Sequence, residues 1–138
     1  MLIHNILRTL GVAALLLGIS LAASARHSIP AEQIDAQKVY YGVAESFETP
    51  AEVSFEDVVR ATDEYDEIRR NNVERGTGKY WILMSQASER AIRAISAIGR
   101  ESEYDLITAR GYIASVDENI EVEDITEKVV ESMEDSGG

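Results

Sequence analysis

The feature that most constrains this chain is a pair of amphipathic segments on either side of a short turn that contains two glycines. From Phe55 to about Arg75 the apolar residues recur in steps of three and four, at Val58, Ala61, Tyr65 and Ile68. From about Lys79 to Gly99 they recur in the same steps, at Tyr80, Met84, Ala87, Ala91, Ala94 and Ile98. This spacing keeps apolar side chains on one helix face, and a glycine turn ends the first helix. The sequence therefore predicts a long antiparallel helical hairpin over about residues 55–100.

The periodicity changes after this hairpin. Residues 104–108 and 112–116 are two runs rich in β-branched and aromatic side chains, separated by a turn that contains Gly111. Asp124 and Glu127 have the spacing of a capping box, which predicts a last helix over about residues 125–134. The expected fold class is therefore α+β, a long antiparallel helical hairpin with a small β-sheet or barrel body.

Two strands alone are marginally stable in water, and their exposed edges favour pairing with other subunits. The sequence therefore predicts an oligomer that assembles through these strands. Its interface would contain the apolar side chains of the two runs, Leu106, Ile107, Ile113 and Val116.

The segment before the hairpin is less regular. Residues 26–34 are expected to be a loose start or a short strand. Residues 35–47 carry apolar side chains at helical spacing. Thr49, Pro50 and Glu52 follow with an N-cap, a proline suited to the first helical position and a capping glutamate. Residues 26–138 are expected to form a single domain.

Residues 1–25 have the pattern of an export signal. Arg8 precedes an apolar run, and Ala23, Ser24 and Ala25 give the small side chains that a signal peptidase needs. The apolar run is shorter than the roughly 20 residues of a membrane span, so we expect cleavage after Ala25 and no stable span afterwards. An uncleaved membrane anchor is the alternative.

Charge and cysteine content exclude several classes of function. The chain has a net charge of −12, and without Arg8 the remaining 25 acidic and 12 basic residues give −13. Such a chain repels nucleic acids and anionic lipid surfaces, and it suits a cationic partner or simple solubility. The absence of cysteine rules out disulfides, thiolate catalysis and zinc–cysteine sites. A small exported domain of this kind depends on its core or on oligomerisation.

The polar motifs do not combine into a recognisable catalytic or metal site. The segment from Gly76 to Lys79 lacks the first glycine and the hydroxyl residue of a phosphate-binding loop. The acidic stretch from Asp117 to Glu123 lacks the glycine and the last glutamate of a calcium loop. Only His27 is left as a histidine after cleavage. We therefore expect no enzyme activity, no cofactor and no metal; a carboxylate hydrolase is the enzymatic alternative.

A group of large side chains in the hairpin suits hydrophobic contact with another protein. Aromatic rings and the flexible methionine side chain bind many apolar surfaces. The candidate client-binding residues are Tyr65, Tyr80, Trp81 and Met84. The alternative is that they only pack the hairpin or the core of an oligomer.

Four segments, in their order along the chain, resemble the Skp/OmpH family of periplasmic chaperones. They cover residues 34–40, 69–76, 104–107 and 124–129. The resemblance implies a trimer whose strands form a barrel body, with helical tentacles around an unfolded outer-membrane protein. It implies a periplasmic, ATP-independent holdase for unfolded or partly folded envelope proteins. The alternative function is a structural adaptor whose helical hairpin docks one specific folded partner.

Overall fold

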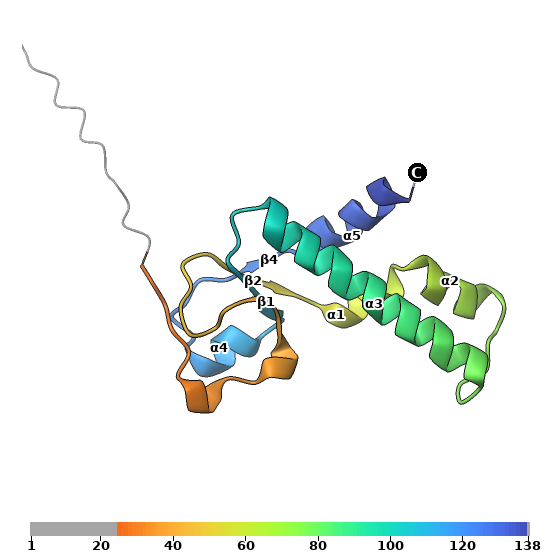
Figure 1. Cartoon of the computed structure of the whole chain (residues 1–138), viewed down its shortest axis with the longest axis horizontal. Coiled ribbons are helices and arrows are strands. Elements are labelled where there is room, and N and C mark those ends of the chain that lie inside the picture. The colour runs from red at the N-terminus through yellow and green to blue at the C-terminus, as the bar shows by residue number, and fades with distance from the viewer. Residues whose placement is uncertain (1–24, 138) are drawn as a thin grey trace, which may run out of the picture.

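The computed structural model describes residues 25–137 (Figure 1). Its strands and helices, in chain order, are β1 (Val39–Gly42), β2 (Pro50–Val53), α1 (Phe55–Arg60), α2 (Asp63–Arg70), α3 (Gly78–Glu101), β3 (Leu106–Ala109), α4 (Tyr112–Val116), β4 (Glu123–Asp124) and α5 (Thr126–Ser136). Two short 3-10 turns, Ala31–Gln33 and Ala36–Lys38, precede β1. The predicted export signal lies outside the described residues except for Ala25. Within residues 25–137, none of the helices is both long and apolar enough to span a bilayer.

The strands form one four-stranded mixed sheet with the order β1-β3-β2-β4. β3 runs parallel to β2 and antiparallel to β1, and β4 runs parallel to β2 on its other side. The chain crosses from β2 to β3 through α1, α2 and α3, and from β3 to β4 through α4. The fold class is therefore α/β, and the predicted α+β fold with a long hairpin and a barrel body is wrong.

Each face of the sheet carries its own apolar core. One core lies between the sheet and α1, α3 and α5, and it contains Ala51, Val53, Val58, Ala87, Ala91, Ile95, Ile107, Ile125 and Val129. The other lies beneath the N-terminal segment and α4, and it contains Ile29, Phe47, Leu106, Tyr112, Ile113 and Ile120. Side chains alternate between the faces along a strand, so Leu106 and Ile107 enter different cores. Both are completely buried because β3 is an inner strand.

The predicted first helix of the hairpin is two short helices. Thr62, which is only 2% exposed, donates its Oγ1 hydrogen to the carbonyl of Val59 at 2.6 Å and accepts from the amide of Tyr65 at 3.2 Å. It thereby closes α1 and caps α2. α2 has 8 residues and α3 has 24, so the two cannot form a long hairpin. The apolar spacing did not reveal this break because the same spacing continues across Thr62.

α3 occupies the segment where the second helix was predicted, but its buried face differs from the predicted seam. The buried residues are Leu83, Ala87, Ala91, Ile95 and Gly99. α3 packs on α1, α2, α5, β1 and β3, so the sheet as well as a partner helix selects its inner face. A Cβ at Gly99 would lie 2.4 Å from the ring of Tyr41, so only glycine allows β1 and α3 this close.

The second predicted strand is the helix α4. Gly111 adopts a positive φ of 81° and turns the chain directly into this helix. The side chains of Tyr112 and Ile113 are then buried in the second core. The Tyr112 hydroxyl donates to the carbonyl of Gln33 at 2.7 Å and accepts from the amide of Asp35 at 2.8 Å. This tertiary packing overrides the β-propensity of the segment.

Strands replace the helices predicted in residues 35–52. β1 directly follows the second 3-10 turn, and Pro50 begins β2, a position at which a strand tolerates proline. The Asp105 carboxylate accepts from the amides of Glu48 and Thr49 at 2.7 and 2.9 Å, which fixes the entry to β2. The helical spacing was misleading because these apolar side chains pack on the two faces of a sheet.

Candidate functional site

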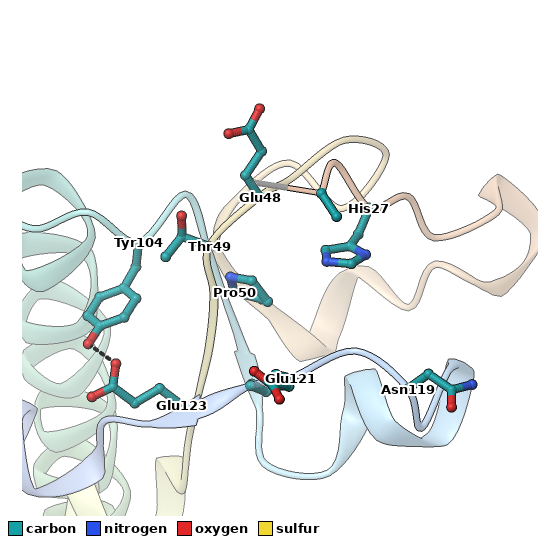
Figure 2. A pocket seen from close by; sticks show the side chains of 10 residues that line it. His27, Glu48, Thr49, Pro50, Tyr104, Asn119, Glu121 and Glu123 are labelled. Carbon is teal, nitrogen blue, oxygen red and sulfur yellow. Dashed lines mark hydrogen bonds between the residues drawn. The ribbon is translucent and has the colours of Figure 1, made fainter. Parts of the chain in front are cut away.

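Two surface regions of the described chain are candidates for a functional site, and the first is an acidic hollow. It is open, has a volume of about 780 Å³, and lies where β2, β3 and β4 begin. Figure 2 shows its side chains, which include His27, Glu48, Tyr104, Glu121 and Glu123. Three carboxylates make its lining negative.

Tyr104 is the best-positioned polar group of the hollow. Its hydroxyl donates to Glu123 (Figure 2) and accepts from Nζ of Lys128 at 2.9 Å. The ammonium group also lies 5.0 Å from the centre of the ring. Burial, and then the hydrogen bond to Glu123, raise the pKa of Tyr104 above its usual value. The phenol therefore keeps its proton at neutral pH. Tyr104, Glu123 and Lys128 together connect this end of the sheet to α5.

The other groups of the hollow do not assemble a reactive centre or a metal site. The ring of His27 packs against Phe47, with 5.6 Å between ring centres. Asp117 accepts from the amide and the side chain of Asn119 at 3.0 and 3.1 Å, as in a local turn. Across residues 25–137, no three His, Asp or Glu side chains are placed to hold a metal ion.

Arg110 lies at the opposite end of the strands from the hollow, where the parallel strands end. Ligands of α/β proteins often bind at this edge. Here the Arg110 Nε donates to Asp124 at 2.8 Å, and its guanidinium also reaches Thr126 at 3.1 Å and Asp57 at 3.8 Å. Burial alone would raise the pKa of Asp124, but hydrogen bonds from Thr126 and Arg110 outweigh it and lower the pKa. The polar groups at this end of the strands therefore pair with one another in a single network.

The second region is the outer face of α3, which we define as Trp81, Ile82, Ser85, Ser88, Ile92 and Arg93. Trp81 is 63% exposed and Ile82 is 60% exposed, although both are large apolar residues. The Tyr80 ring supports Trp81 edge-on, with ring centres 5.4 Å apart and planes at 83°. In Figure 1 this part of α3 lies with α2 at the end of the molecule away from α4.

The outer face is held on a well-anchored helix. Thr77 caps α3 by accepting from the amide of Tyr80 at 3.2 Å. On the opposite side of α3, Arg90 donates to both carboxylate oxygens of Glu64 on α2, at 2.8 and 3.0 Å from Nε. This ion pair lowers the pKa of Glu64 and raises that of Arg90, in each case mainly through the hydrogen bonds between them.

The structure separates the two groups of predicted site residues. Among the predicted client-binding residues, Trp81 is exposed and Tyr80 is half-buried, whereas Tyr65 and Met84 pack against the first core. Of the predicted interface residues, Leu106, Ile107 and Ile113 are completely buried inside a single chain, and Val116 packs against the second core. The second group is therefore covered by the chain's own elements.

The predicted client-binding residues include neither Ile82 nor Ile92, although both are exposed on this face. A signal was present: residues 81–84 are four consecutive large apolar residues, and one buried helix face cannot cover all of them. Comparison with protein-family models, with curated proteins and with solved structures gave no match.

Proposed function

We propose that this chain is an exported, non-enzymatic adaptor that binds a folded protein partner on the outer face of α3. The observation that carries the proposal is the exposure of Trp81, at 63%, beside Ile82, at 60%. Large exposed apolar side chains that are grouped on one surface mark interaction sites more often than isolated ones do. Tryptophan is also among the residues that contribute most to protein interfaces.

The surroundings of Trp81 suit a specific contact. The indole projects from a capped helix that is anchored to α2, so little conformational entropy is lost when a partner orders it. Ser85 and Arg93 add hydrogen-bonding groups to the same face. A fitting partner would offer a recess for the indole with a polar rim, because such pockets accommodate interface aromatics.

Charge favours the same region. We define the arm as residues 63–93, and this arm has six acidic and six basic residues. The remainder of the chain after Ala25, which we call the sheet body, has 19 acidic and 6 basic residues and so a net charge of −13. A protein partner therefore meets the least electrostatic opposition at the arm.

The alternative is the periplasmic holdase that the sequence resemblance implies. Exposed apolar surface on a highly charged chain is compatible with it. A holdase, however, needs a broad and adaptable surface, whereas the exposed apolar residues of the arm form a short stripe on one rigid helix. This difference favours a single folded partner over many unfolded ones.

Site-specific photo-crosslinking in the producing cell separates these functions. A crosslinking amino acid replaces Ser85 on the outer face of α3, and Val43, which is 58% exposed on the sheet body, serves as the control position. We expect one discrete adduct from position 85 that Trp81→Ala removes, and none of that mass from position 43. Many adducts at position 85, together with suppression of aggregation of a denatured β-barrel protein, would support the holdase instead. No adduct at position 85 would overturn both.

A further inference from the structure

We propose that the partner of the outer face of α3 is a second copy of this chain, packed antiparallel about a twofold axis. The inference rests on the proposed function of this face as an interaction surface, and it names the partner. It arises because the recess that Trp81 requires is present on the same face of the same helix.

The recess is an open hollow of about 380 Å³ lined by Ser85, Ser88, Glu89, Ile92 and Arg93. It exists because two small serines lie between the larger side chains of Trp81 and Ile92. A projecting indole and a hollow of sufficient size therefore follow each other along one helix.

The spacing of these features is self-complementary. Trp81 and Ser88 are separated by seven residues, about 10 Å along the axis and nearly two full turns, so they share a face. A twofold axis that crosses α3 close to Ser85 places Trp81 of each copy over the recess of the other. Such an interface is isologous, because every contact occurs twice. The small Ser85 side chain at the axis allows the two helices to approach closely.

The recess also matches the chemistry of the indole. Arg93 lies on its rim, 3.7 Å from Glu89 across the ion pair. A guanidinium stacks favourably on an aromatic ring, and a carboxylate accepts the indole N–H, which is a donor only. Ile92, 39% exposed, adds an apolar wall.

Electrostatics selects the antiparallel arrangement. Each sheet body carries a net charge of −13, whereas the arm is neutral. Antiparallel pairing of the arms places the two bodies at opposite ends of the pair, where screening by salt weakens their repulsion most. A parallel pair would bring the bodies together and would place Trp81 against Trp81 instead of against a hollow.

Sedimentation of the chain that begins at Arg26 tests this inference over a range of concentrations. We expect twice the monomer mass at about 100 μM, because a small interface of this kind binds at about micromolar strength. Trp81→Ala, which removes the indole, and Ser88→Phe, which fills the recess, should each weaken the dimer at least about tenfold. Val43→Ser should leave it unchanged, and added salt should strengthen it. A monomer at this concentration, or a dimer whose affinity is the same in both outer-face variants as in the parent, would overturn the inference.

A single engineered cysteine gives a second and independent readout, since the chain has no cysteine of its own. Ser85→Cys at the axis should form a disulfide between two copies under mild oxidation, because facing Cα atoms fall within disulfide reach. Val43→Cys should not. If the Ser85→Cys protein stays monomeric while the photo-crosslinker at position 85 still gives a discrete adduct with another protein, the self-association is wrong and the adaptor function stands.

Discussion

The sheet body and the arm differ in how completely their apolar faces are covered and in their net charge. In the sheet body both faces of a four-stranded sheet are covered, and β3, one of its two inner strands, is buried on each side. In the arm, the inner side of α3 packs on α2 and on the first core, whereas the outer side keeps two large apolar residues more than half exposed. The sheet body is also strongly acidic, while the arm is neutral. Under the proposed function, the body provides stability and solubility, and the arm provides contact.

The largest expected effect comes from Leu106→Asp, which places a carboxylate in the second core. Leu106 is completely buried on the inner strand, so the charge has no partner and no access to water. We expect a loss of about 4 kcal/mol or more in the free energy of unfolding. Urea denaturation followed by circular dichroism measures it, and Ala114→Asp at an exposed position of α4 is the control. A folded variant that only dissociates an oligomer would instead restore Leu106 as an interface residue.

An intermediate effect is expected where the C-terminal part of α3 packs on β1. Gly99→Ala forces a methyl group into the ring of Tyr41, and overpacking of this kind costs about 1–3 kcal/mol. The matched control is Gly78→Ala in the first turn of α3, where nothing lies within 4 Å of the new methyl group. That change should be neutral or stabilising by up to about 1 kcal/mol. In a double-mutant cycle, Tyr41→Ala should recover part of the loss. Equal costs at the two glycines would mean that the close approach at Gly99 has no energetic role.

The smallest effect concerns the ion pair inside the arm. Glu64→Gln removes the charge that binds Arg90, and we expect a loss of about 1 kcal/mol at pH 7, since Arg90 is partly exposed to solvent. The pKa of Glu64 is lower in the folded protein, so its stabilisation is present above the ordinary value of about 4.3 and disappears as the pH falls through the folded pKa.

Urea denaturation at pH 7 and at about pH 3 should therefore show a difference between parent and Glu64→Gln that shrinks in acid. Glu67→Gln is the control, because Glu67 lies 3.5 Å from Lys79 in a more exposed pair and should change stability little. A difference that grows as the pH falls would contradict the assigned ion pair.

Periodicity predicted the arm better than the sheet body. α3 occupies the segment predicted from residues 79–99 because six apolar positions repeat over a long window. Strands of four residues or fewer, such as β1, β2 and β4, are too short to show a period. The break at Thr62 depends on one side chain that bonds in both directions along the backbone, which apolar spacing does not reveal.

The candidate site was predictable in part for the same reason. Trp81 was identified from its residue type, but the face of α3 that remains open depends on which elements cover the others. Leu106 and Ile113 are predicted in an intermolecular sheet because the sequence pattern shows no other element that would cover them. β1, β2 and the N-terminal segment supply that cover from the same chain.

The way in which the arm is attached has an evolutionary consequence. It is an excursion within the crossover from β2 to β3, and these two strands are hydrogen-bonded neighbours from Pro50 and Leu106 to Val53 and Ala109. The strand register depends on that pairing and not on how far the excursion extends. Matched insertions of about seven residues on each side of the turn, two helical turns each, would lengthen the arm and keep its faces aligned. Such insertions can thus extend the arm while the sheet stays intact.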